Sequence, residues 1–329
     1  MNEEFDEFGE FGEFGLPSYV GATTFQKLPL CPDEERLRAA GAEVAVVGAP
    51  FDDAASHRPG ARFGPRAIRT ASYHAGELWS IQLETEVFSR LAVVDAGDAP
   101  VTPGRPDRAH RVIGEQVRRV VGAGATPIVL GGDHSITLPS VAAVAAAHRP
   151  RSVGVVHFDA HADTAADVWG ALRSHGTPMR RLIEEGWVRG PNFVQVGLRG
   201  YWPGRDTFAW MREQGMRWHR MVEIEERGAE EVVARAIEEA LDGPDAVYLS
   251  VDIDVLDPSA APGTGTPEPG GLLARELLRA VRQIVSSVEL AGMDVVEVSP
   301  PYDHAEITAA AAHRCVLEAL AALAAKKPA

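Results

Sequence analysis

Cysteine is scarce in this 329-residue chain, which contains only Cys31 and Cys315. The two residues lie far apart and lack metal-binding or redox spacing, which excludes a disulfide framework and a cysteine-based zinc site. Sparse cysteine is typical of a reducing compartment, so we expect a cytoplasmic protein. The sequence also lacks a continuous apolar run of about 18 residues, and its start is acidic rather than basic, so we expect no membrane-spanning segment and no signal peptide.

Basic residues are also in short supply. The chain has 32 Lys and Arg against 47 Asp and Glu, which gives a formal net charge of −15. A surface with this charge repels nucleic acid and anionic membranes, so we expect neither as a partner. The acidic surplus is compatible with a small cationic substrate.

The chain begins with a low-complexity acidic segment. Glycine and like-charge repulsion disfavour order there, so residues 1–40 are predicted to form a flexible acidic tail and a lead-in segment. The alternative is that the phenylalanines of the tail dock on a neighbouring subunit. The tail contains the acids Glu3, Glu4, Asp6, Glu7, Glu10 and Glu13 and the phenylalanines Phe5, Phe8, Phe11 and Phe14.

From about residue 42, short apolar runs alternate with helix-like stretches. Continuous apolar runs of this length are typical of parallel strands covered on both faces, and the alternation predicts a three-layer α/β/α sandwich with a mainly parallel sheet. No repeat or linker divides the chain, so residues 41–329 are predicted to form a single domain. The runs cover residues 44–47, 91–94, 127–130, 152–156, 193–196, 246–250 and 292–296. The helix-like stretches cover residues 110–121, 139–147, 178–185, 230–241 and 274–287.

Polar residues follow four of these runs, beginning at Asp133, His157, Asp252 and Glu297. Open parallel sheets bind ligands beyond the carboxyl ends of their strands. We therefore expect these four segments to converge on one edge of the sheet.

Two of the segments have the spacing of metal ligands. Asp159, His161 and Asp163 alternate along an extended segment, so their side chains share one side, and Asp252 and Asp254 repeat the arrangement. Ionisable groups that face one way are desolvated at high cost unless a cation lies between them. Either group alone could be a polar strand end or a turn. Together with a further histidine they give six candidate ligands: His134, Asp159, His161, Asp163, Asp252 and Asp254.

Four carboxylates and two imidazoles favour a hard divalent cation. Structural zinc prefers Cys and His in a closed tetrahedron, whereas a mostly carboxylate site suits Mn²⁺, with Fe, Co or Ni as alternatives. Four carboxylates balance the charge of two divalent ions. Two ions that share a water molecule lower its pKa from about 15.7 to near neutrality, so the residues predict a hydrolase with two Mn²⁺ per subunit.

Six segments carry the pattern of a known family, at residues 131–135, 158–163, 174–178, 250–258, 261–267 and 294–300. They resemble the ureohydrolase family, which contains arginase, agmatinase, guanidinobutyrase and their relatives. The resemblance covers residues 43–320 and includes every metal-ligand motif in the same order. It implies the arginase fold with an eight-stranded parallel sheet, a homotrimer or homohexamer, and cleavage of a guanidinium compound into urea and an amine.

The resemblance also implies a role for each residue. Glu297 would accept the guanidinium through charge-assisted hydrogen bonds, and His175 would be a proton shuttle. Asp163 would carry the proton from the attacking water to the leaving amine. Structural alternatives are a buried acid at Glu297 and a loop-capping histidine at His175, and Asp257 is expected to cap a turn. Among the metal ligands, Asp159 and Asp252 would bridge the ions, His134 and Asp163 would complete one shell, and His161 and Asp254 would complete the other.

The sequence lacks residues that would be expected for an arginine substrate. The segment Gly-Leu-Arg199 is not followed by the acids that arginase-like members place there, and segments 57–65 and 301–308 resemble the agmatinase branch. Agmatine, cleaved to putrescine and urea, is therefore favoured over arginine. Asp167 would suit the far cation of agmatine, whereas Arg173 would suit guanidinobutyrate or another guanidino acid, and the sequence leaves open which faces inward. A guanidino natural product is a further alternative, with a pocket mouth lined by Trp169, Tyr201, Trp202 and Trp210 or with these residues simply packing loops.

Two hypotheses from other classes remain. A single-metal deacetylase on the same fold would not need the full set of Asp163, Asp252 and Glu297. A catalytically silent binding protein would not need to keep every ligand position. Release of urea from a panel of guanidines separates both hypotheses from a guanidino hydrolase.

Overall fold

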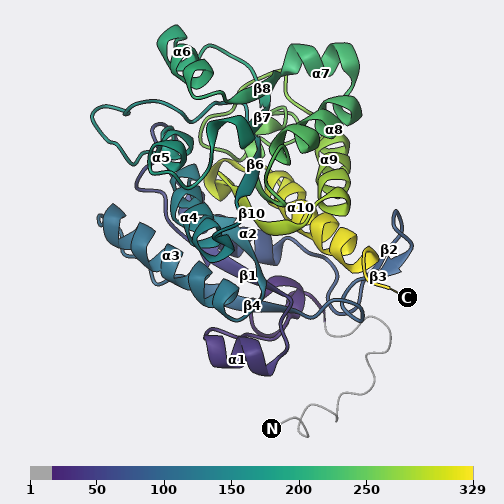
Figure 1. Ribbon diagram of the computed structural model, residues 1–329. Helices are drawn as coiled ribbons and strands as arrows, with labels where there is room; N and C mark the ends of the chain where they lie inside the picture. The colour runs from purple at the N-terminus through teal and green to yellow at the C-terminus, as the bar shows by residue number, and fades with distance from the viewer. Residues whose placement is uncertain (1–16, 329) are drawn as a thin grey trace, which may run out of the picture.

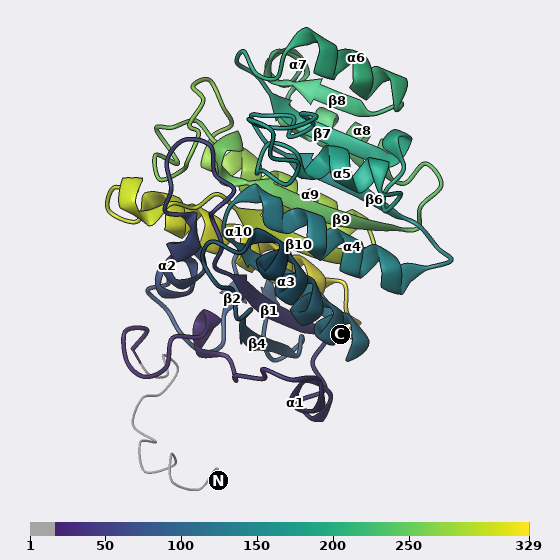
Figure 2. The same cartoon turned by 90° about the vertical axis from the view of Figure 1, so that its left-hand side faces the viewer.

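A parallel sheet of eight strands lies at the centre of the computed structural model, which describes residues 17–328 (Figures 1 and 2). The strand order is β4-β1-β5-β10-β9-β6-β7-β8, and every neighbouring pair is parallel. The predicted α/β/α sandwich is therefore confirmed. The strands are β1 Val44–Ala49, β4 Val93–Asp98, β5 Thr126–Gly131, β6 Val153–Phe158, β7 Phe193–Leu198, β8 Arg217–Arg220, β9 Ala246–Asp252 and β10 Leu290–Val296. A separate hairpin pairs β2 Trp79–Ser80 with β3 Thr85–Glu86.

Helices cover both faces of the sheet, and each layer encloses a hydrophobic cluster (Figure 2). One cluster receives side chains from α2 Gly64–Thr70, α7 Met221–Arg227, α8 Ala229–Ala240, α9 Ala274–Ser287 and α10 Ile307–Ala325. The other receives side chains from α1 Glu34–Ala39, α3 Pro106–Gly122, α4 Thr137–His148, α5 Pro178–Glu184 and α6 Arg205–Glu213.

The interior strands form where the sequence has continuous apolar runs. Strands β1, β6, β7, β9 and β10 are buried at every residue, as expected when helices cover both faces of a sheet. The edge strand β8 was not predicted, because its Arg-Trp-His-Arg sequence contains no apolar run. Within residues 17–328 it pairs with β7 alone, and its second edge has no strand partner there.

Among the described residues, α10 is the one helix long and apolar enough to cross a membrane by length and composition. Its most apolar 18-residue window has a mean hydropathy of 1.4, and 67% of that window is buried inside the structure. Cys315 and Leu320 are fully buried in the core. A core helix of a folded domain has these same properties.

The phenylalanine-rich tail lies outside the described residues, so its flexibility or docking stays a prediction. The lead-in segment that follows packs on the rest of the chain. Phe25 stacks on His313 of α10 with 4.5 Å between the ring centroids, and Leu37 of α1 is buried in the cluster that also contains α3. Residues 25–40 therefore share both hydrophobic clusters with the segments that follow, while the predicted division of the chain at residue 40 stays a prediction.

Candidate metal centre

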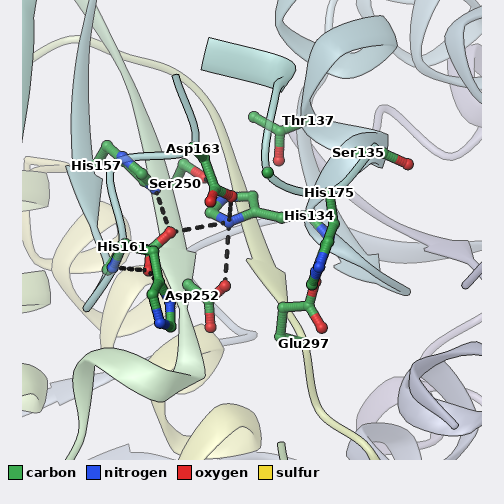
Figure 3. A network of polar contacts seen from close by, with 12 residues as sticks. His134, Ser135, Thr137, His157, His161, Asp163, His175, Ser250, Asp252 and Glu297 are labelled. Carbon is green, nitrogen blue, oxygen red and sulfur yellow. Dashed lines mark hydrogen bonds and ion pairs between the residues drawn. The ribbon is translucent and has the colours of Figure 1, made fainter. Parts of the chain in front are cut away.

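The predicted site residues meet at the carboxyl ends of four neighbouring strands, in the order β5, β10, β9 and β6. His134 follows β5, Glu297 follows β10, Asp252 ends β9 and Asp159 follows β6. The sheet thus brings together segments that are far apart in the chain. His134 and Ser250, for example, are in contact although 116 positions separate them in the sequence. Figure 3 shows this convergence.

His134 lies in the middle of the cluster and is fully buried (Figure 3). Its Nδ1 atom lies 3.2 Å from Asp159 Oδ2, 3.1 Å from Asp163 Oδ2 and 3.0 Å from Asp252 Oδ2. Despite these distances, Nδ1 has no hydrogen-bond partner within the described part of the chain. One imidazole nitrogen therefore faces three carboxylate oxygens at once.

The other side of the ring determines which nitrogen carries the proton. Nε2 of His134 lies 3.0 Å from Ser250 Oγ, and the Ser250 hydroxyl donates to Asp294 at 2.7 Å. Because the serine proton is directed at Asp294, Nε2 donates to Ser250 and Nδ1 keeps its lone pair. A lone pair aimed at three anionic oxygens is unfavourable unless a cation lies between them.

The carboxylates also carry uncompensated charge. Burial, together with Asp254 and Asp159, raises the pKa of Asp252 well above its usual range. Burial lowers the pKa of His134, but Asp159, Asp163 and Asp252 outweigh it and raise that pKa well above its usual value. A divalent ion bound at Nδ1 would take the place of the proton that the carboxylates otherwise favour there. These residues therefore fit a metal ion.

A second group lies beside the first. Nδ1 of His161 lies 3.0 Å from Asp254 Oδ2 and 3.3 Å from Asp159 Oδ1. Asp159 thus turns one carboxylate oxygen to each group, which is the arrangement of a bridging ligand. Asp252 differs, because its Oδ2 faces His134 while its Oδ1 accepts the backbone N–H of Asp254 at 2.8 Å.

His175 is held between two segments. Its Nδ1 lies 2.9 Å from Glu297 Oε1, and the backbone N–H of Ser56 donates to its Nε2 at 3.0 Å (Figure 3). The Ser56 hydroxyl lies 2.6 Å from the same Nε2. Burial lowers the pKa of His175, but Glu297 and Asp163 outweigh it and raise that pKa to about 9. The Ser56 backbone N–H opposes protonation of His175, because it can donate only to an Nε2 atom that carries no proton. Cations bound beside Asp163 would also favour the neutral imidazole.

Glu297 is buried and keeps one oxygen available. Its Oε1 accepts the backbone N–H of His134 at 2.7 Å, whereas Oε2 has no partner among residues 17–328. Burial raises the pKa of Glu297, but His175 outweighs this effect and lowers it. Glu297 and Asp163 also have backbone φ angles of 63° and 51°, in the left-handed region that side chains other than glycine rarely adopt. Backbone strain of this kind concentrates at functional sites.

A cavity of about 590 Å³ reaches the cluster, and His161, Asp163, Asp252 and His175 lie on its wall. Asp167 lines it, whereas Arg173 does not and points to Asp107, 3.9 Å away. Of the four candidate mouth aromatics, only Trp169 and Trp202 line this cavity. Its other lining residues are Ser56, Val168, Gly176 and Thr266, so no Lys or Arg faces it from the described residues.

Three remaining candidates lie outside the cavity. Tyr201 is fully exposed, and Trp210 lies 4.2 Å from the guanidinium of Arg180. Asp257 is a turn acceptor, as expected, since its carboxylate accepts the backbone N–H of Ser259 at 2.9 Å. The hydrogen bonds that the hydroxyl and the backbone N–H of Ser259 donate to Asp257 lower the pKa of this carboxyl to about 2.

A family profile decides the relationship of this chain to known proteins. The profile described as "Arginase family" matches residues 42–322. The chain belongs to the arginase family. It is therefore a hydrolase of C–N bonds in linear amidines and a guanidino hydrolase of that family. The family depends on a binuclear manganese centre, with which the histidine and aspartate cluster is compatible.

Several arginase-family relatives match most of the chain. Proclavaminate amidinohydrolase from Streptomyces clavuligerus is 42% identical over 89% of this chain and 90% of its own length. Its solved structure superimposes with a TM-score of 0.86 at 39% identity and covers 95% of this chain and 100% of that one. Guanidinopropionase from Pseudomonas aeruginosa is 42% identical over 94% of both chains. Agmatinase from Chromobacterium violaceum is 37% identical over 94% of this chain and 91% of its own.

The sequence placed Asp133 and His157 at the start of polar segments but gave no role to them or to the other polar residues that orient the candidate ligands of this arginase-family chain. His157 Nε2 lies 2.9 Å from Asp159 Oδ2, and Gln195 donates to His157 Nδ1 at 3.1 Å. Asp133 accepts the backbone N–H of Ala54 at 2.9 Å and so ties the Ser56 loop to His134. The contact of His157 with Asp159 could have been predicted, because His157 stands two residues before Asp159 on the same side of a strand. Asp133 follows a glycine pair and gives no such signal.

Proposed function

We propose that this chain is an agmatinase, which hydrolyses agmatine to putrescine and urea with two Mn²⁺ ions per subunit. One observation carries the proposal: a cavity that reaches the His134 and His161 groups is lined by the acid Asp167 and by no described Lys or Arg. The guanidinium end of the substrate would lie over the two groups, and its far ammonium would lie near Asp167.

The six predicted ligands are assigned to two ions from their positions. His134 and Asp163 would hold one ion, and His161 and Asp254 would hold the other. The contacts of Asp159 with both groups support a bridging role, and Asp252 is proposed as the second bridge. Bound divalent ions lower the pKa of a water molecule so that it can attack at neutral pH.

The remaining groups bind the substrate and move protons. The guanidinium carbon is a poor electrophile, because its charge is delocalised over three nitrogens, so the substrate must be held in one orientation. We assign Glu297 Oε2, a buried oxygen without a partner in the described chain, to a guanidinium N–H. Asp163 lies both beside His134 and on the cavity wall, where it can carry a proton to the leaving amine. His175 also lines the cavity and would exchange that proton with solvent.

The far end of the substrate decides between agmatine and the guanidino acids. Asp167 accepts the backbone N–H of Gly170 at 2.8 Å, which holds its carboxylate on the cavity wall. Trp169 and Trp202 add aromatic faces that attract a cation. A guanidino acid would place its carboxylate beside Asp167 without a basic partner. The names of two relatives keep a guanidino acid as the second candidate, since they are called guanidinopropionase and proclavaminate amidinohydrolase.

Urea release from four compounds tests the proposal: agmatine, guanidinobutyrate, guanidinopropionate and arginine. Agmatine should have the highest kcat/KM, and arginine should be disfavoured by roughly a few kcal/mol, because its α-carboxylate would be buried without a partner. Asp167→Asn should lower kcat/KM for agmatine about fivefold, within the range of a partly exposed ion pair, and should raise it for guanidinobutyrate, whose carboxylate would no longer lie beside an acid.

The matched control is Asp107→Asn, which removes an exposed acid that does not line the cavity. A preference of the parent enzyme for guanidinobutyrate would contradict the agmatine assignment but would leave the guanidino hydrolase intact. We further propose a cytoplasmic location and a homotrimer or homohexamer. The molar mass in solution tests the assembly.

A further inference from the structure

A second depression, of about 320 Å³, is lined by residues of the β2–β3 hairpin and of helix α10. The hairpin lies beside the end of this helix (Figure 1). We call it the hairpin groove and define it by Tyr73, Leu78, Trp79, Ile81, Val87 and Leu317. Three of these side chains are strongly exposed, with Tyr73 at 81%, Trp79 at 56% and Ile81 at 74%. Large apolar side chains gathered at one place on a surface are typical of a site that another segment covers.

The start of the chain is anchored beside this groove. Gln26 Nε2 donates to Ser72 Oγ at 2.8 Å and lies 2.8 Å from His313 Nε2. Ser72 directly precedes Tyr73, and His313 directly precedes Arg314, which also lines the groove. The described chain is therefore anchored beside the groove at Gln26. Eleven residues separate the last tail phenylalanine from Gln26, so even a fully extended connection places that phenylalanine within about 40 Å of this anchor.

The tail has a repeat that suits an apolar groove. Residues 4–15 are four triplets, each with a glutamate, then a phenylalanine, then a small or acidic residue, which is aspartate in the first triplet and glycine in the others. A period of three matches the three residues per turn of an extended polyproline II backbone. In that conformation the phenylalanines would form one ridge, spaced by about 9 Å, and the glutamates would form another. Such a segment can bury its apolar ridge and leave its charges in water.

The charges around the groove permit an acidic occupant. The Glu77 carboxylate accepts the backbone N–H groups of Val87 and Phe88 at 3.0 and 2.9 Å, and Glu318 pairs with Arg282 at 2.8 Å. Both acids of the groove are therefore engaged with partners. His74 and Arg314 line the same depression and offer basic groups to the tail glutamates.

We propose that residues 4–15 of the same chain dock in the hairpin groove, with phenylalanine side chains in the groove and glutamates toward solvent. Docking covers the exposed aromatic surface of the hairpin and ties the beginning of the chain to its last helix. The inference stands apart from the catalytic assignment, because the groove shares no lining residue with the cavity at the metal centre.

Hydrogen exchange of the intact protein tests the docking. The backbone amides of residues 73–87 should exchange about tenfold more slowly in the parent than in a variant with Phe5, Phe8, Phe11 and Phe14 changed to Ser. This value follows if the free tail peptide binds with a dissociation constant of about 0.1 mM and tethering supplies about 1 mM. The matched control changes Glu4, Glu7, Glu10 and Glu13 to Gln and should keep the slow exchange. Equal exchange in the parent and the Phe→Ser variant would overturn the proposal.

A mixed oligomer separates docking within one chain from docking on a neighbour. The Phe→Ser chains, which keep an intact groove, are assembled with Trp79→Asp chains, which keep an intact tail but carry a charge in the groove. If each tail occupies its own groove, the intact grooves exchange as fast in the mixed oligomer as in the Phe→Ser protein alone. Slow exchange of these grooves would show that a second copy supplies the tail, which overturns the same-chain assignment.

Discussion

Ser56 contacts one nitrogen of His175 through both its backbone N–H and its hydroxyl, and these contacts predict a positioning role for a residue outside the metal cluster. Ser56→Ala keeps the backbone N–H but removes the hydroxyl, so kcat should fall about fivefold, the worth of one hydrogen bond, with KM and metal content unchanged. Steady-state kinetics and metal analysis check this outcome. Ser287→Ala, on the exposed side of α9, is the control and should leave kcat unaltered. A loss of metal or of thermal stability in Ser56→Ala would instead indicate a structural role.

At the residue scale, the sequence predicted which side chains gather but not how each one faces. Successive side chains of an extended segment point to opposite sides, so Asp159, His161 and Asp163, two residues apart, share one side. Their convergence could therefore be predicted. The loop that carries Asp167 and Arg173 has no regular period, so its inward side was open until the structure placed Asp167 on the cavity wall. The roles of the individual ligands stay predictions.

The edge strand β8 is tied to two helices by one histidine. His219 Nδ1 lies 3.1 Å from Glu223 Oε2 of α7, and its Nε2 lies 3.0 Å from Glu239 Oε2 of α8. Burial lowers the pKa of His219, but Glu239 and Glu223 outweigh it and raise that pKa above 6.5. A raised folded-state pKa contributes stability that is fully present below the unfolded value, about 6.5, and is lost as pH rises through the folded value.

His219→Gln should therefore lower the free energy of unfolding more at pH 6 than at pH 9. Hydrogen bonds to charged groups are worth about 1.5–3 kcal/mol, which sets the scale of the loss at the lower pH. Urea unfolding of metal-free protein at both pH values measures the difference. His148→Gln is the control, because the Nδ1 atom of that ring lies 3.0 Å from the uncharged carbonyl oxygen of Val144. A loss that is equal at both pH values would contradict the ionic role.

At the element scale, burial decides what could be predicted. Strands covered on both faces have continuous apolar sequences and were found, whereas β8 lies at an edge and has an alternating basic and aromatic sequence. Helix α10 was missed for the opposite reason. It is buried on most sides and rich in alanine, so it has little of the 3.6-residue periodicity that marks an amphipathic helix.

Metal ions should contribute to the stability of the whole molecule. The two ligand groups exist only in the folded chain, so each site filled at about a hundredfold its dissociation constant adds about 2.7 kcal/mol. Chelation should therefore lower Tm by roughly 4 °C per site, and Mn²⁺ should restore it. Calorimetry with and without chelator checks this. Asp254→Asn, which leaves the His134 group intact, should show about half of the shift. An unchanged Tm on full removal of metal would contradict the assignment.

The sheet has a central strand that is made last. Strand β10 lies between β5 and β9, and only helix α10 and its flanking residues follow it in the chain. While the protein is being synthesised, β5 and β9 can emerge from the ribosome without the partner that separates them. Glu297 arrives later still, directly after β10. Any nascent chain or truncated product that ends before residue 290 therefore lacks both the middle strand of the sheet and Glu297, so the metal centre can assemble only after β10 has been made.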